Sequence, residues 1–132
     1  MLPFYAGASE YTPKTELSNH TGIFEFSGVS RPENVSEFYN KLINWIREFE
    51  QHCIGTGKWP ENGITVNFKL TYCNSASSKY IYQLLEMILG WMKYGIKPVV
   101  NWYFDENDDT MRDDGMDIAD ALDYEFNFLP ME

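Results

Sequence analysis

Cysteine, histidine and basic side chains are scarce in this 132-residue chain. The two cysteines, Cys53 and Cys73, have no metal-ligand spacing, so we interpret them as reduced thiols and expect neither a zinc site nor a disulfide framework. The two histidines, His20 and His52, fall in different predicted segments, and we interpret each as a surface side chain. These scarcities argue against a resident metal and against histidine-based catalysis.

Long apolar runs and targeting signals are also missing. No apolar stretch approaches the length of a membrane span, and residues 1–7 lack the basic and long apolar regions of a signal peptide. Together with reduced cysteines, this predicts a cytoplasmic protein with no membrane insertion. The length and a hydrophobic content of 44% suit one core, so we expect a single domain over residues 1–132.

Negative charge is concentrated in one segment. The chain has 20 acidic and 10 basic residues, a net charge of −10. Residues 105–125 hold ten of the acidic residues and one basic residue, Arg112, which gives −9, whereas the remainder of the chain carries −1. This excludes ordinary binding to nucleic acid, which needs basic clusters. The acidic segment is either a solvated surface or a docking surface for a basic partner.

Alternating and helical periodicities predict an α/β fold. Strands are expected at residues 4–11, 23–27, 64–73, 99–104 and 126–129. Helices are expected from the capping-box pair Asn34 and Glu37 to Gly55, at about 76–94 up to Gly95, and within 109–123, where Gly115 interrupts the pattern. The order β-β-α-β-α-β-α-β implies a mixed five-stranded sheet, mostly parallel after an opening hairpin, with helices mainly on one face.

The most informative segment is the junction 71–79, where a strand ends and a helix begins. Ile64, Val66, Phe68, Leu70 and Tyr72 form the apolar side of the strand pattern. A row of hydroxyls follows at the turn. Either Ser75 or Ser77 caps the helix, or a hydroxyl there accepts a phosphate, which a helix N-terminus stabilises.

Three loops are expected along one edge of the sheet, because the segments that follow parallel strands emerge on the same side. These loops are Gly28–Asn34, Cys73–Lys79 and Asp105–Thr110. Their proximity would combine a Pro-Glu-Asn turn, a hydroxyl-rich turn and an acidic turn. We predict a site at this edge.

Catalytic and cofactor chemistry finds little support at this edge. Asp105, Asn107 and Asp109 match the start of an EF-hand loop, but Thr110 stands where glycine is needed and Met116 where a bidentate glutamate is needed. No glycine-rich phosphate loop follows a strand, so no nucleotide cofactor is expected. A Ser75–Lys79 catalytic pair lacks any sign of an oxyanion site. We therefore predict no catalytic residues, no metal and no cofactor.

Two segments resemble the SiaC-type bacterial regulatory phosphoproteins. Residues 28–34 (GVSRPEN) are similar to the family's G-x-S-x-P-E-N turn, and residues 72–79 (YCNSASSK) resemble its Y-x-N-[ST]-x-S-x-K segment. The segment 101–105 and the acidic third helix are similar too, so the resemblance runs from about residue 10 to the C-terminus. It implies an architecture like the STAS domains of anti-sigma-factor antagonists.

The resemblance also implies a mechanism, partner switching without catalysis. A cognate Ser/Thr kinase would phosphorylate the residue after the asparagine, a PP2C-type phosphatase would reverse this, and the unphosphorylated form would activate a diguanylate cyclase in cyclic-di-GMP signalling. Ser75 matches the phosphoacceptor. Because the family more commonly has threonine there, and Ala76 follows here, Ser77 and Ser78 remain alternatives.

The predicted partner-binding residues come from all three loops. They are Ser30, Arg31, Pro32, Glu33, Asn34, Asn74, Ser77, Ser78, Lys79, Asp105 and Asn107. Two other functions stay open. One is an anti-sigma-factor antagonist, and the other is a metal-dependent enzyme that uses the acidic edge.

Overall fold

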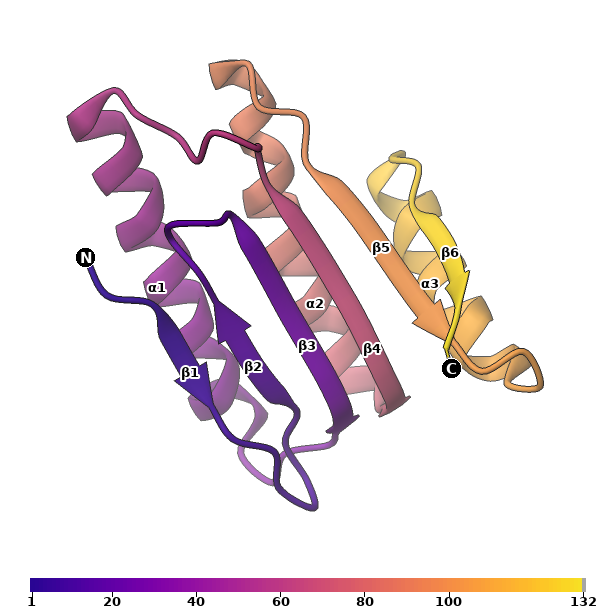
Figure 1. Cartoon of the computed structure of the whole chain (residues 1–132). Helices are drawn as coiled ribbons and strands as arrows, with labels where there is room; N and C mark the ends of the chain where they lie inside the picture. The colour runs from indigo at the N-terminus through magenta and orange to yellow at the C-terminus, as the bar shows by residue number, and fades with distance from the viewer. Residues whose placement is uncertain (132) are drawn as a thin grey trace.

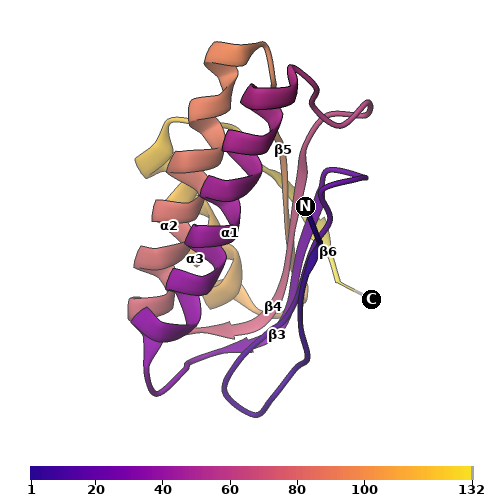
Figure 2. The ribbon, with the colours of Figure 1, turned by 90° about the vertical axis from the view of Figure 1, so that its left-hand side faces the viewer.

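The computed structural model describes residues 1–131, which form one six-stranded sheet with three α-helices. The strands are β1 (Phe4–Ala6), β2 (Lys14–Leu17), β3 (Ile23–Ser30), β4 (Thr65–Cys73), β5 (Val99–Phe104) and β6 (Asn127–Pro130). The helices are α1 (Val35–Thr56), α2 (Ser75–Leu89) and α3 (Asp109–Leu122), and a short 3-10 helix, η1 (Gly90–Tyr94), prolongs α2. All three helices cover the same face of the sheet (Figures 1 and 2).

The sheet is mixed, with strands in the order β1-β2-β3-β4-β5-β6. The β1–β2 and β2–β3 pairs are antiparallel, whereas β3, β4, β5 and β6 run parallel to one another. Each parallel step is a crossover through one helix, which places α1, α2 and α3 in turn on the covered face (Figure 1). The predicted α/β class, with a mixed sheet and helices on one face, is confirmed.

The predicted number of five strands is wrong, because residues 14–17 form an additional strand. Thr15 and Leu17 are buried, whereas Lys14 and Glu16 are exposed, so β2 alternates over only four residues between two turn signals. Such a short alternation is indistinguishable from a loop in the sequence. The first strand ends at Ala6 and pairs with β2. The antiparallel pair that precedes α1 is therefore formed by β2 and β3, not by the first strand and β3 as predicted.

The boundaries of α1 and the end of η1 follow the predicted capping signals closely. The Asn34 side chain accepts a 3.1 Å hydrogen bond from the Glu37 backbone N–H, so Asn34 is the N-cap of α1. Gly57, with φ of 69°, closes that helix two residues beyond the predicted Gly55. Gly95, with φ of 85°, ends η1 as predicted.

Gly115 explains how α3 approaches the sheet. A Cβ atom at this position would lie 2.6 Å from atoms of the Trp102 indole, so only glycine lets the helix lie this close to β5. The Trp102 Nε1–H donates a 2.9 Å hydrogen bond to the Met111 carbonyl, which ties the same ring to α3. The interior glycine that lowers helix propensity is therefore required by packing.

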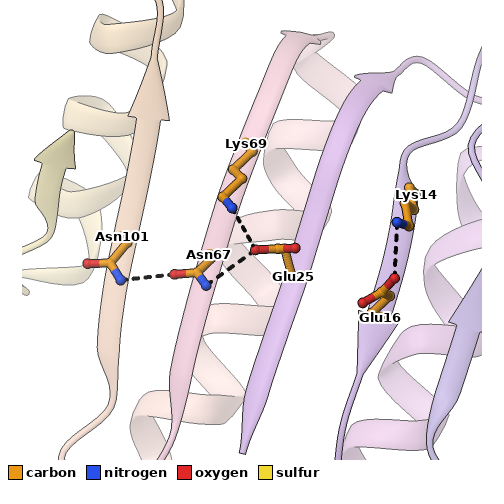
Figure 3. A network of polar contacts seen from close by, with 6 residues as sticks. All are labelled: Lys14, Glu16, Glu25, Asn67, Lys69 and Asn101. Carbon is orange, nitrogen blue, oxygen red and sulfur yellow. Dashed lines mark hydrogen bonds and ion pairs between the residues drawn. The ribbon is translucent and has the colours of Figure 1, made fainter. Parts of the chain in front are cut away.

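The uncovered face of the sheet carries a row of polar side chains across four strands. Asn127 donates to Asn101, Asn101 donates to Asn67, and both bonds are 2.9 Å long. Asn67 donates to the Glu25 carboxylate at 3.5 Å, and that carboxylate pairs with Lys69 at 2.9 Å (Figure 3). The three asparagine contacts join register partners on neighbouring strands, the Lys69–Glu25 pair is diagonal, and together these contacts hold the register.

Candidate functional site

The first two predicted loops meet at the carboxyl edge of the sheet. Ser30, the last residue of β3, is the register partner of Cys73, the last residue of β4. The Asn74 backbone N–H donates a 3.1 Å hydrogen bond to the Ser30 carbonyl. The turn into α1 and the turn into α2 are thus side by side (Figure 1).

A β-bulge near the end of β4 decides which side chains face this edge. Leu70 pairs with Gly28 and Tyr72 pairs with Val29, so Thr71 is an extra residue in β4. The bulge reverses the alternation: Tyr72 is 50% exposed, whereas Cys73 is buried. The expectation that Tyr72 continues the apolar side of the strand is therefore wrong, because one extra residue moves every later side chain to the other face.

Gly28 explains the glycine of the first motif. Gly28 lies opposite the bulge, and its φ of 102° belongs to a region that residues with a side chain disfavour. The Thr71 hydroxyl donates a 3.3 Å hydrogen bond to the Gly28 carbonyl, which fills the irregular pairing. The glycine of the first motif is therefore explained by the backbone conformation at this edge of the sheet.

Asn74 is the N-cap of α2, so the expectation that Ser75 or Ser77 caps this helix is wrong. The Asn74 side chain accepts a 2.8 Å hydrogen bond from the Ser77 backbone N–H. Ser75 is the first helical residue and is exposed. Its hydroxyl forms no hydrogen bond within residues 1–131. Ser75 thus presents a free hydroxyl at a helix start whose cap is supplied by another residue.

Ser77 lies in a buried hydroxyl network with Ser30 and Tyr39. The Ser30 hydroxyl donates to the Ser77 hydroxyl at 2.9 Å, and the Ser77 hydroxyl donates to the Ser30 carbonyl at 3.1 Å. The Tyr39 hydroxyl lies 2.6 Å from the Ser30 hydroxyl, and burial raises the pKa of Tyr39. All three side chains are almost inaccessible to solvent. The network fastens the start of α2 to the end of β3.

Ser78 is half-buried beside Cys73, with 3.3 Å between its hydroxyl oxygen and the cysteine sulfur. Burial raises the pKa of the Cys73 thiol to about 11, the charge of Asp114 adds to this, and the hydrogen bond with Ser78 opposes it. At neutral pH a thiol with this pKa is protonated, and the protonated thiol is a poor nucleophile.

The remaining residues of the first motif divide between structure and surface. The Arg31 guanidinium lies over the Tyr11 ring at 5.2 Å, and Pro32 is buried. Glu33 and Asn34 are exposed, and Asn34 caps α1 as described above. Arg31 and Glu33 are therefore the residues of this turn that a partner can reach without displacing a cap.

A cavity of about 440 Å³ lies between α2 and α3, beside Ser75. It is lined by Cys73, Ser75, Ser78, Lys79, Tyr82, Asp114, Asp117, Ile118 and Ala121. Of the residues that line this groove, the sequence analysis named Ser75, Ser78 and Lys79 on α2 and none on α3. A signal existed, since Asp114, Asp117, Ile118 and Ala121 recur at helical spacing.

The predicted residues Asp105 and Asn107 do not line this cavity. Their loop leaves β5 at the same edge of the sheet, as expected, but its polar groups bond to one another. The Asp105 side chain accepts a 2.9 Å hydrogen bond from the Asn107 backbone N–H, and Asp108 caps α3 by accepting from Met111. This loop leads into α3, whose Asp114 and Asp117 line the cavity.

Two features are absent from residues 1–131. None of their helices combines the length and the apolar character needed to cross a bilayer. Nor do these residues gather three or more His, Cys, Asp or Glu side chains in a group that could hold a metal ion. The acidic side chains of α3 are spread along its surface.

Solved structures of similar shape come from Pseudomonas aeruginosa. A crystal structure of apo-SiaC aligns with a TM-score of 0.74 and 20% identity over 100% of both chains. A chain in the crystal structure of the diguanylate cyclase SiaD in complex with its activator SiaC aligns with a TM-score of 0.80 and 18% identity, covering 97% of this chain and 99% of that one. The fold is therefore the SiaC-like α/β fold.

Sequence comparison is consistent with that class. A protein of Pseudomonas aeruginosa (strain UCBPP-PA14), named only as uncharacterized, is 22% identical over 111 residues, which are 84% of this chain and 82% of the relative. The family model described as "SiaC family regulatory phosphoprotein" matches residues 6–131. The chain belongs to the SiaC family of regulatory phosphoproteins.

Proposed function

We propose that this protein is a non-enzymatic switch whose phosphorylation at Ser75 controls the binding of partners. A Ser/Thr kinase adds the phosphate and a PP2C-type phosphatase removes it. The unphosphorylated form binds and activates an effector, a diguanylate cyclase, as the Pseudomonas SiaC is named the activator of SiaD. The switch operates in the cytoplasm.

The observation that carries this proposal is the free, exposed hydroxyl of Ser75 at the first position of α2. Ser77 is fully buried and bonded to Ser30, so a kinase could reach it only after the edge opens. Ser78 is half-buried against Cys73. Of the three candidate serines, Ser75 is the most exposed, which supports it as the phosphoacceptor.

Charge explains how one phosphate changes binding. Phosphorylation adds roughly −1.5 to −2 charge at neutral pH. The N-terminus of α2 stabilises an anion by about 0.3–2 kcal/mol, so the fold can hold the phosphate without rearranging. A partner that covers the Ser75 hydroxyl would instead have to bury a dianion, which costs several kcal/mol. The effector therefore binds the unmodified form.

The test is intact mass spectrometry after incubation with the Ser/Thr kinase of the same organism and ATP. The wild type should gain one phosphate, Ser75→Ala should gain none, and the matched variant Ser78→Ala should behave as the wild type. Absence of phosphate anywhere in residues 74–79, with a kinase proven active, would overturn the proposal. Phosphate on Ser77 or Ser78 would overturn the assignment of Ser75.

Effector binding provides the second part of the test. Ser75→Ala should bind the diguanylate cyclase as the wild type does, since removal of a hydroxyl adds no charge to the contact. Ser75→Glu should weaken binding, by less than phosphate does, because a carboxylate carries less charge and fewer acceptors. If Ser75→Glu and the phosphorylated protein both bound the cyclase as tightly as the unmodified wild type does, charge-controlled switching would be contradicted.

A further inference from the structure

The outer edge of β1 exposes unpaired backbone groups. Bonded and non-bonded pairs alternate along an antiparallel ladder, and the 3.1 Å bond from the Ser18 N–H to the Ile23 carbonyl fixes the phase of that alternation. Carried along β2 and across to β1, the alternation turns the peptide groups of Phe4 and Ala6 toward β2. The N–H and the carbonyl of Tyr5 therefore point outward, to the side where the sheet of residues 1–131 ends.

This edge lacks the charges that commonly protect an edge strand from pairing with another chain. Residues 1–9 carry no charged side chain. Leu2 and Tyr5, 82% and 66% exposed, are the most exposed large hydrophobic side chains of residues 1–131. The strand at the other edge, β6, contains Pro130, which has no N–H to offer, whereas the proline beside β1, Pro3, lies outside the strand. Of the two edges, β1 is thus the one open to strand addition.

The segment before β1 is held in place. The Trp45 Nε1–H on α1 donates a 3.0 Å hydrogen bond to the Leu2 carbonyl, and the Asn19 side chain donates a 3.3 Å bond to the Met1 carbonyl. An edge fixed in this way loses little conformational entropy when another strand is added.

A second copy of the chain can reach this edge at little electrostatic cost. The net charge of −10 opposes self-association in general, but −9 of it lies in residues 105–125, which follow β5 and form α3. β1 and α3 lie toward opposite ends of the sheet (Figure 1). The strand spacings between β1 and β5, about 4.8 Å each, add up to more than the screening length of about 8–10 Å. Joining two copies at β1 therefore keeps their acidic segments far apart.

We propose that two copies of this protein pair through their β1 strands, antiparallel and centred on Tyr5. The pairing is symmetric, because the Tyr5 N–H of each copy donates to the Tyr5 carbonyl of the other. The Gly7 N–H of each copy donates to the Pro3 carbonyl of the other, and the two Tyr5 rings lie opposite each other across the new ladder. A contact this short is weak, so the dimer forms at high protein concentration and exchanges rapidly.

This dimer leaves the Ser75 edge of each copy free. β1 runs parallel to β3, since both are antiparallel to β2, and the two-fold axis reverses every strand of the second copy. The carboxyl edges of the two copies thus face in opposite directions, and partners bound there do not meet. The inference does not rest on phosphorylation, and its tests use the unmodified protein.

Sedimentation equilibrium of the full chain at a series of rising concentrations tests the pairing. The weight-average mass of the wild type should rise from 15.4 kDa toward twice that value. Tyr5→Lys places two like charges opposite each other at the centre of the pairing and should weaken association by about tenfold. The control Ile23→Lys adds the same charge at a 45% exposed position of β3, away from the edge, and should weaken association by less than about threefold. Circular dichroism verifies that both variants are folded.

Cross-linking tests the register. Cys53 and Cys73 are buried, so a disulfide formed under mild oxidation reports an added cysteine. The Cα atoms of a bonded antiparallel pair lie about 5.5 Å apart, within the reach of a disulfide, so Tyr5→Cys should give a covalent dimer and Ile23→Cys should not. A wild type that stays monomeric at the highest concentration, equal weakening by the two lysine variants, or no covalent dimer of Tyr5→Cys would overturn the inference.

Discussion

The hydroxyl of Ser30 donates a 2.9 Å hydrogen bond to the hydroxyl of Ser77, which lies 47 residues later in the chain. The Ser77 hydroxyl returns a bond to the Ser30 carbonyl at 3.1 Å. Ser30 belongs to the motif at residues 28–34, and Ser77 belongs to the motif at residues 72–79. Their contact makes the turn into α1 and the turn into α2 one structural unit, with Ser75 on its outer surface.

Ser77→Ala should therefore destabilise the fold, whereas Ser75→Ala should not. Loss of the Ser77 hydroxyl removes two buried hydrogen bonds and leaves the Ser30 carbonyl with one partner fewer, at a cost of about 1–2 kcal/mol. Urea denaturation monitored by tryptophan fluorescence measures the change. Equal midpoints for Ser77→Ala and the wild type would show that the network contributes nothing to stability.

Asn74→Ala should destabilise the protein by about 0.5–2 kcal/mol, because it removes the side-chain acceptor for the Ser77 backbone N–H. Asn74→Asp keeps that acceptor and should stay within about 0.5 kcal/mol of the wild type, since Asn and Asp cap equally well. The same denaturation assay compares the two variants. If Ser75→Ala cost as much as Asn74→Ala, the assignment of the cap would be wrong.

Gly115→Ala should lower stability by about 1–3 kcal/mol, although alanine is the better helix former. The added methyl group would meet the Trp102 ring at 2.6 Å and push α3 away from β5. Gly55→Ala in α1 is the matched control, since a Cβ atom there meets nothing within 4 Å. That variant should gain up to about 1 kcal/mol, and opposite signs for the two glycines are the result that supports close packing.

Asp114→Asn should stabilise the protein at neutral pH by about 0.2–0.5 kcal/mol, the size of one repulsive pair on a helix. Partial burial and the charge of Asp117 raise the pKa of Asp114, which means that the folded state takes up a proton more readily than the unfolded state. The penalty in the wild type is thus present above that pKa and disappears as the pH falls through it. Thermal unfolding from neutral to acidic pH should show the advantage of the variant shrinking.

A control separates this effect from a general loss of negative charge. Asp113 is exposed and lies 3.5 Å from the Arg112 guanidinium, so Asp113→Asn removes an attractive contact as well as a charge. It should stabilise the protein less than Asp114→Asn does at neutral pH. A similar gain in stability for Asp113→Asn and Asp114→Asn would show that charge repulsion is not concentrated on the groove side of α3.

Local sequence signals were sufficient where a residue acts through its own backbone or its nearest neighbours. Asn34 and Glu37 marked the start of α1, Gly95 the end of the helical segment after α2, and the strand at 99–104 matched its alternation. Capping and alternation depend on contacts a few residues apart, so the sequence carries them directly. The α/β class and the parallel half of the sheet followed from these elements.

Local sequence signals could not predict β2 or the bulge at Thr71. Four alternating residues become a strand only because β1 and β3 lie on either side of them. The extra residue in β4 is defined by its pairing with β3, and this pairing turns Cys73 toward the helices and Tyr72 outward. Register is a property of two strands, so one strand's pattern could not reveal it.

The candidate site divides in the same way. The sequence by itself determined that hydroxyls follow a strand and begin a helix and that residues 105–125 are strongly acidic. It also predicted that the three loops share one edge, which the parallel pairing of β3, β4 and β5 confirms. Tertiary structure alone decided that Ser77 is buried against Ser30, that Ser75 is free, and that α3 brings Asp114 and Asp117 opposite Lys79. The reason is physical: burial and charge pairing depend on distances between segments, and only the packed chain sets those distances.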